Sequence, residues 1–139
     1  MILLDTNVLS ALMRERREEK VDRWLDRQPR NSVWTTSINV FESRFGLEAM
    51  PAGKHRTQLL MIFEQLLSQT IQGRIANFDS AAAEQAAVQM AARKKAGRLM
   101  EIRDTMIAGI VLASHATLAT RNVKHFEEIA SSVVNPWEA

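Results

Sequence analysis

The chain contains no cysteine and no tyrosine among its 139 residues. Without cysteine it can form neither disulfide bonds nor thiolate metal sites, which suits a reducing cytoplasm. No apolar run approaches the roughly 20 residues that a membrane-spanning helix needs, and the N-terminus lacks the basic stretch of a signal peptide. We therefore expect a cytoplasmic protein without membrane contact and without a thiolate metal site.

The excess of positive charge is also small, with a formal net charge of +2. This value does not by itself indicate a nucleic-acid partner. Five basic residues nevertheless gather in one short interval, namely Arg93, Lys94, Lys95, Arg98 and Arg103. Such a cluster either follows the phosphates of a nucleic acid or forms the solvated end of a helix.

Apolar patterning predicts strands and helices in alternation. The expected strands cover residues 2–4, 32–36, 74–78, 117–120 and 132–135. The expected helices cover residues 8–13, 14–28, 37–50, 54–72, 80–96 and 103–115, with a short helical turn at 123–130. Strands separated by helices indicate an α/β fold, with three α/β/α layers around a mostly parallel sheet of four or five strands. We expect one domain spanning residues 1–139.

Asp5 directly follows the first of these strands. Three apolar residues without a polar break, Ile2 to Leu4, are typical of a central strand buried on both faces. Ligands of open α/β sheets bind at the carboxyl ends of the strands, so a carboxylate at this point is placed for chemistry. Asp is equally favoured as the N-cap of a following helix, and this stretch alone leaves both interpretations open.

Glu42 lies beside an apolar stripe on the helix predicted at 37–50. The stripe consists of Ile38, Phe41, Phe45 and Ala49. Because Glu42 borders it, its carboxylate is costly to bury unless it is paired or coordinated. The alternatives are a side chain that turns outward to water and an ion pair with a neighbour such as Arg44.

Asp104 stands in the first turn of the most apolar helix, in line with Ile107 and Val111, and is expected to point inward. The helix dipole favours a negative charge there by about 0.3–1 kcal/mol. Simple capping is the alternative. Asn122, after the strand at 117–120, can offer a carbonyl oxygen to a cation or cap the turn that follows.

Three inward carboxylates on three elements would repel one another, so their convergence requires a cation. Oxygen ligands without cysteine or paired histidines suit Mg²⁺ or Mn²⁺. Such an ion lowers the pKa of a bound water and stabilises charge on phosphoryl oxygens, which is the chemistry of phosphodiester cleavage. We expect His115 to be buried and structural and His55 and His125 to be exposed, which leaves no histidine pair for metal-free cleavage.

The ordered set of these motifs resembles PIN domains, and most closely the VapBC-type toxins of the FitB-like branch. The matching segments are residues 2–8 (ILLDTNV), the helix of Glu42, residues 102–108 (IRDTMIA), residues 119–122 (ATRN) with Phe126, and residues 133–137 (VVNPW). The resemblance covers essentially the whole chain. It implies a Mg²⁺- or Mn²⁺-dependent endoribonuclease that cleaves single-stranded or loop RNA. It also implies a homodimer that a small DNA-binding antitoxin neutralises and joins into a larger assembly.

The resemblance also assigns roles to particular residues. The acidic, metal-binding site maps onto Asp5, Glu42 and Asp104, and the hydroxyls of Thr6 and Thr120 fall where the family orients metal-bound waters. The family's fourth acidic position, frequently Asp, is Asn122 here, which weakens a second metal position. The residues expected to hold RNA phosphates are Arg93, Lys94, Lys95, Arg98, Arg103 and Arg121.

Two competing functions remain to be weighed. A haloacid-dehalogenase-type phosphatase also opens with a strand ending in Asp, but its general acid two residues later is replaced by Asn7. A PIN-fold module that binds RNA or an antitoxin without cutting is favoured by Asn122. Val40 and Leu47, opposite the main stripe of their helix, suggest either a dimer contact or packing against the adjacent helix.

Overall fold

A five-stranded sheet forms the centre of the molecule, with strand order β3-β2-β1-β4-β5 and every neighbouring pair parallel. The strands are β1 (Ile2–Leu4), β2 (Val33–Thr36), β3 (Ile75–Ala76), β4 (Thr117–Ala119) and β5 (Ser132–Val134). The computed structural model describes residues 1–129 and 132–139. The expected α/β architecture is confirmed, whereas the predicted end of the helical turn at Ala130 lies outside the described residues.

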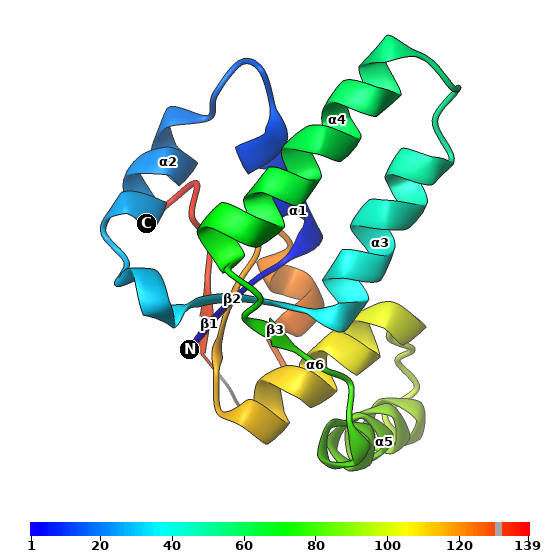
Figure 1. Ribbon diagram of the computed structural model, residues 1–139. Coiled ribbons are helices and arrows are strands. Elements are labelled where there is room, and N and C mark those ends of the chain that lie inside the picture. The colour runs from blue at the N-terminus through cyan, green and yellow to red at the C-terminus, as the bar shows by residue number, and fades with distance from the viewer. Residues whose placement is uncertain (130–131) are drawn as a thin grey trace.

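Helices cover both faces of this sheet (Figure 1). They are α1 (Thr6–Met13), α2 (Glu19–Asp26), α3 (Ser37–Glu48), α4 (Lys54–Gln65), α5 (Ser80–Lys95) and α6 (Ile102–Ser114), with the short helices η1 (Arg30–Ser32), η2 (Leu66–Ile71) and η3 (Val123–Phe126). Neighbouring side chains of a strand point to opposite faces. Leu4 accordingly packs with α1, α2 and α4, and Leu3 packs with α5 and α6. Two apolar cores, one on each face, produce the expected three layers.

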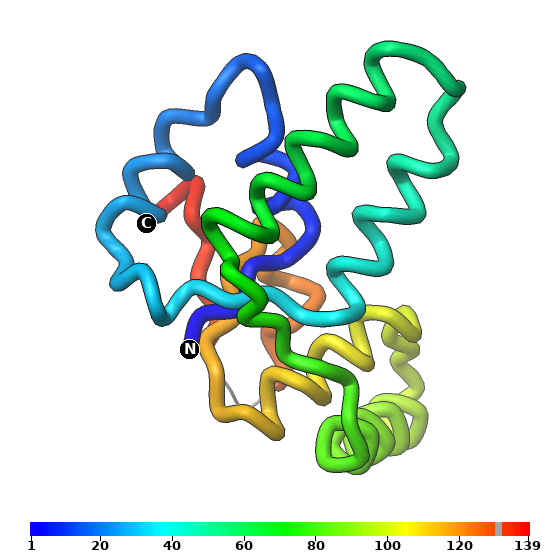
Figure 2. The backbone as a smooth tube through the Cα atoms, in the orientation of Figure 1, coloured from blue at the N-terminus to red at the C-terminus, as the bar shows by residue number. Residues whose placement is uncertain are grey.

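Helices α3 and α4 form a hairpin that projects from the body of the molecule (Figure 2). Val40 and Leu47 face the core there, so they serve packing within the chain. Phe41 and Phe45 are instead 57% and 60% exposed, and their rings stack with centroids 6.4 Å apart. The expected burial of Phe41 and Phe45 is therefore wrong, because this part of α3 packs through its opposite face, whereas Ile38 at the start of the stripe does pack against a core.

Helix α6 packs closely against α5 through Gly109. A Cβ atom at Gly109 would lie 2.4 Å from the carbonyl oxygen of Ala82 and 2.8 Å from the Cβ of Ala86. Only glycine allows this approach, which fixes the position of α6 and of Asp104 in its first turn. At the other end of α6, His115 is the exposed, left-handed C-cap residue with φ 52°, so its expected burial is wrong.

The C-terminal residue lies beside α2, where Arg27 Nη2 donates a hydrogen bond to the carbonyl oxygen of Ala139 at 3.2 Å.

Across residues 1–129 and 132–139, no helix has both the length and the apolar composition needed to cross a membrane.

Candidate active site

The register of the sheet brings polar residues from three strands to one edge. Leu4 lies opposite Thr35 of β2 and Ala119 of β4. The next residue of each strand, Asp5, Thr36 and Thr120, therefore falls on the same row at the carboxyl edge. This is the edge where ligands of open α/β sheets bind.

Asp5 is buried, with 5% of its surface exposed, and each of its carboxylate oxygens accepts hydrogen bonds. Oδ1 accepts from the backbone N–H of Thr6 at 2.9 Å and from Asn39 Nδ2 at 2.7 Å. Oδ2 accepts from Thr120 Oγ1 at 2.6 Å and from Asn7 Nδ2 at 3.4 Å. The bond to Thr6 caps α1, so the capping and the site interpretations of Asp5 hold together. Four donors make a buried carboxylate tolerable in a place where it would otherwise be costly.

Asn39 is a member of this site that the sequence analysis did not identify. It is fully buried, and its Nδ2 donates both to Asp5 and to Thr6 Oγ1, the latter at 3.0 Å. Its Oδ1 accepts from Thr36 Oγ1, and its backbone N–H donates to the same hydroxyl at 3.0 Å. Thr36 is thus the N-cap of α3. The Thr36 cap could have been predicted from a Thr at the start of the helix, but nothing local indicates that the Asn39 side chain binds Asp5.

Glu42 faces the same edge from α3. Thr6 Oγ1 donates to Glu42 Oε1 at 3.0 Å, and Arg103 Nη1 lies 3.5 Å from Oε2. Burial raises the pKa of Glu42, as do the charges of Asp5 and Asp104, while the hydrogen bond from Thr6 opposes this rise. Arg44, the alternative partner, instead pairs with Glu64 at 2.7 Å.

Asp104 approaches from α6 and does not cap that helix. Glu101 is the N-cap, and its Oε2 accepts from the backbone N–H groups of Arg103 and Asp104 at 2.9 and 3.1 Å. Burial, followed by the charge of Asp5, raises the pKa of Asp104, whereas His125 lowers it. His125 Nδ1 lies 3.1 Å from Asp104 Oδ2, although the His125 side chain is 56% exposed.

His125 was expected to be exposed, but its contact with Asp104 was not anticipated. No local sequence pattern predicts this contact, because η3 brings His125 to Asp104 only when the chain after β4 folds back toward α6.

Of the three polar residues expected to support the site, Thr6 and Thr120 bind the carboxylates directly and Asn122 does not. Thr6 donates to Glu42, and Thr120 donates to Asp5. Asn122 is exposed and precedes η3, but its side chain makes no capping hydrogen bond with the described residues of that helix. Its backbone N–H donates to Thr120 Oγ1 at 3.0 Å.

The basic residues expected to hold RNA make different contacts in the structure. Arg93 and Arg98 both pair with Glu128, and the Arg121 guanidinium lies 4.8 Å from the centre of the Trp137 ring. Only Arg103 contacts one of the three acids in the described part of the chain. Lys94 and Lys95 are exposed in the last turn of α5.

The three acids match a hard divalent cation by their chemistry, since they offer only oxygen donors, and burial together with the charge of Asp5 raises the pKa values of Glu42 and Asp104. In this conformation they do not enclose one point. Within residues 1–129 and 132–139, no three His, Cys, Asp or Glu side chains are grouped closely enough to hold one metal ion. Instead, two of the acids are contacted by basic side chains: Arg103 lies beside Glu42, and His125 lies beside Asp104.

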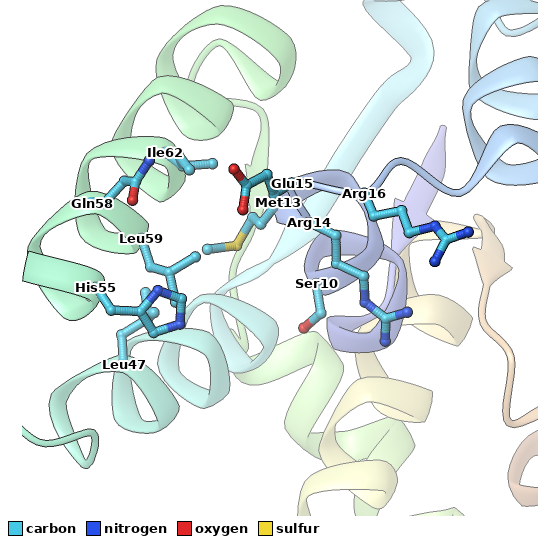
Figure 3. Close-up of a pocket in the computed structure, with 10 residues that line it drawn as sticks. All are labelled: Ser10, Met13, Arg14, Glu15, Arg16, Leu47, His55, Gln58, Leu59 and Ile62. Atoms are coloured by element: carbon cyan, nitrogen blue, oxygen red, sulfur yellow. The ribbon is translucent and has the colours of Figure 1, made fainter.

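A separate apolar groove of about 480 Å³ lies between α1, α3 and α4. Figure 3 shows Met13 and Leu59 pointing toward one another across it. Leu47 and Ile62 complete the apolar walls, and charged side chains such as Glu15 stand at the rim. Asp5, Glu42 and Asp104 are not among the described residues that line this groove.

Known proteins resemble this chain over its full length. The PIN-domain family matches residues 2–131. The chain is 38% identical over 138 residues to VapC ribonuclease Y4jK of Sinorhizobium fredii, covering 99% of both proteins. It is 34% identical over 137 residues to toxin FitB of Neisseria gonorrhoeae, again covering 99% of both. The solved structure of FitAB bound to the IR36 DNA fragment superposes with a TM-score of 0.88 at 34% identity, covering 99% of this chain and 96% of that one. The chain therefore belongs to the PIN-domain family, among the VapC and FitB toxins of toxin–antitoxin systems.

Proposed function

We propose that this chain is a Mg²⁺- or Mn²⁺-dependent endoribonuclease toxin that hydrolyses phosphodiester bonds in single-stranded or loop RNA. The observation that supports it most is that Asp5, Glu42 and Asp104 face the same edge of the sheet closely enough to feel one another's charge, with the pKa values of Glu42 and Asp104 raised. Residues 1–139 act as one PIN domain, and the lack of cysteine favours the cytoplasm as its setting.

Each acidic residue has a defined part in this proposal. Asp5, Glu42 and Asp104 hold the divalent ion, which when bound would lower the pKa of a coordinated water and neutralise charge on the scissile phosphate. Asn39 and Thr120 keep the Asp5 carboxylate in one orientation, and Thr6 does so for Glu42. The basic side chains from α5 and from the start of α6 hold the RNA backbone through its phosphates, which positions the substrate without reading its sequence.

The test is to map the cleavage ends in total cellular RNA with Mg²⁺, with Mn²⁺ and with a chelator. We expect metal-dependent ends that disappear in Asp5→Asn and in Asp104→Asn. Asp26→Asn is the matched control, since it removes the same charge from an exposed position at the end of α2. Cleavage that survives Asp104→Asn, or that needs no metal, would contradict the proposed site.

A module that binds RNA or an antitoxin without cutting remains the second candidate, because Asn122 replaces a carboxylate at the fourth corner of the site. The same experiment separates the two. Absence of metal-dependent cleavage, together with a melting temperature that Mn²⁺ does not change, would favour the module over the nuclease.

We also propose a small DNA-binding antitoxin as the partner. A relative is named toxin FitB, and a similar solved structure is FitAB on a DNA fragment. The apolar groove between α1, α3 and α4 suits an amphipathic segment of that partner, because its walls are apolar and its rim is charged.

The groove assignment is tested by co-expression with the neighbouring small reading frame. Leu59→Glu should abolish co-purification and leave RNA cleavage intact, since Leu59 lines the groove and none of the three acids does. Met61→Glu is the control, because Met61 lies on the same helix, is exposed and does not line the groove. Equal loss of the complex in both variants would contradict the assignment.

A homodimer completes the proposal. Its support is the stacked, exposed pair Phe41 and Phe45 on α3, an apolar surface that a monomer would leave in water. Light scattering at micromolar concentration should give twice the monomer mass of 15.7 kDa, and Phe41→Ser with Phe45→Ser should give the monomer. A wild-type monomer at that concentration would rule the dimer out.

A further inference from the structure

Arg103 holds an unusual place among the basic residues, because its guanidinium bridges the acidic site and the cap of α6. Its Nη1 lies 3.5 Å from Glu42 Oε2, and its Nε donates to Glu101 Oε1 at 3.2 Å. Glu101 at the same time accepts the backbone N–H of Arg103 through Oε2. Glu101, the N-cap residue of α6, thus binds both the backbone N–H and the side-chain Nε of Arg103. These two bonds orient the guanidinium toward Glu42.

The Arg103 guanidinium partly neutralises the Glu42 carboxylate, whose surroundings otherwise disfavour a negative charge. Glu42 is half-buried and faces the negative charges of Asp5 and Asp104. A divalent ion bound by the same acids would place two further positive charges next to the guanidinium. The two cations would repel each other, so the ion and the Arg103 contact compete for Glu42.

We infer that Arg103 is a resident counter-cation of Glu42, which a divalent ion displaces and which then binds an RNA phosphate beside the site. The displaced side chain has a suitable chemistry, since a guanidinium binds phosphate with two parallel hydrogen bonds. It also has the freedom to move, because its side chain is 41% exposed. Metal binding would thereby prepare an RNA contact, and RNA would in turn strengthen metal binding, since such coupling is reciprocal. This inference rests on the proposed nuclease function.

The first experiment measures Mn²⁺ binding to the full chain without RNA, by the electron paramagnetic resonance signal of free Mn²⁺. Removing the competing cation in Arg103→Gln should tighten Mn²⁺ binding about two- to fivefold, the range typical of a partly exposed ion pair. Arg103→Lys should stay within about twofold of wild type, because it keeps the charge. Arg23→Gln is the matched control, since it removes an equal charge from the exposed surface of α2 and should change nothing.

The second experiment measures the affinity for a single-stranded oligoribonucleotide by fluorescence anisotropy at several salt concentrations. Ca²⁺ replaces Mn²⁺, and the RNA is checked to be intact afterwards. With Ca²⁺, the slope of log K against log salt should be shallower in Arg103→Gln than in wild type by about 0.7, the value for one phosphate contact on a single strand. With a chelator in place of Ca²⁺, the two slopes should agree, because the guanidinium then remains on Glu42.

The outcomes separate this inference from the proposed function. Unchanged or weaker Mn²⁺ binding in Arg103→Gln would overturn the competition. Slopes that agree in Ca²⁺, or that differ equally in the chelator, would overturn the metal-dependent movement, even if the wild type cleaves RNA as proposed. A wild type that neither binds Mn²⁺ nor cleaves RNA would overturn both.

Discussion

Asn39→Ala is the substitution for which the structure allows the clearest estimate of stability. Asn39 is fully buried and donates to the charged carboxylate of Asp5, and it shares two further hydrogen bonds with Thr6 and Thr36. A bond to a charged group contributes about 1.5–3 kcal/mol and each neutral bond about 0.5–1.5 kcal/mol. Because the three bonds belong to one network and do not add fully, we expect a loss of about 3–5 kcal/mol in the free energy of unfolding.

Urea denaturation followed by circular dichroism measures this loss directly. For a chain of 139 residues, the corresponding fall in melting temperature is about 10–20 °C. Asn77→Ala is the control, since Asn77 is exposed and follows β3. It should change the free energy of unfolding by less than about 0.5 kcal/mol.

A double-mutant cycle then tests the reason for the loss. If Asn39 chiefly stabilises the charge of Asp5, Asn39→Ala should cost much less in an Asp5→Asn background, with a coupling energy of about 1.5–3 kcal/mol. A loss below about 1 kcal/mol in the single variant, or additive effects within about 0.5 kcal/mol, would refute the reasoning. Asn39 would then be an ordinary helix residue with no part in holding Asp5.

Four further predictions concern the acids and two helical glycines. The pKa values of Glu42 and Asp104 are raised, and a protonated carboxyl cannot hold a cation. Metal-dependent cleavage should therefore decrease as the pH is lowered. A pH–rate profile should place the midpoint of this decrease above the ordinary carboxyl pKa of about 4. Asp104→Asn, which abolishes cleavage, should raise the metal-free free energy of unfolding at pH 7 by about 0.5–2 kcal/mol. That gain should vanish below pH about 4, where Asp104 is protonated in the wild type as well. Gly109→Ala should destabilise the protein by about 1–3 kcal/mol, because the new Cβ would overlap Ala82. In thermal denaturation Gly46→Ala, which meets nothing within 4 Å in exposed helix, should instead stabilise it by up to about 1 kcal/mol.

The order of the elements could be predicted because hydrophobic periodicity is a local property. The apolar run before Asp5 indicated the central strand, which the structure has at Ile2–Leu4. The face that a helix buries was less predictable. On α3 both the Phe41 stripe and the Val40 side are apolar, and only contact with α1 and α4 decides between them.

The sequence by itself determined which residue types can do chemistry and where they stand along the chain. It placed Asp5 after a buried strand, Glu42 on a helix and Asp104 in the first turn of another, and the lack of cysteine excluded thiolate ligands. The tertiary structure alone decided what each acid touches. Asn39 holds Asp5, Arg103 faces Glu42 and His125 faces Asp104 because parallel register and the close packing of α6 join segments separated by 21 to 61 positions in the chain. Contacts across such separations depend on the path of the whole backbone, so no local pattern of residues encodes them.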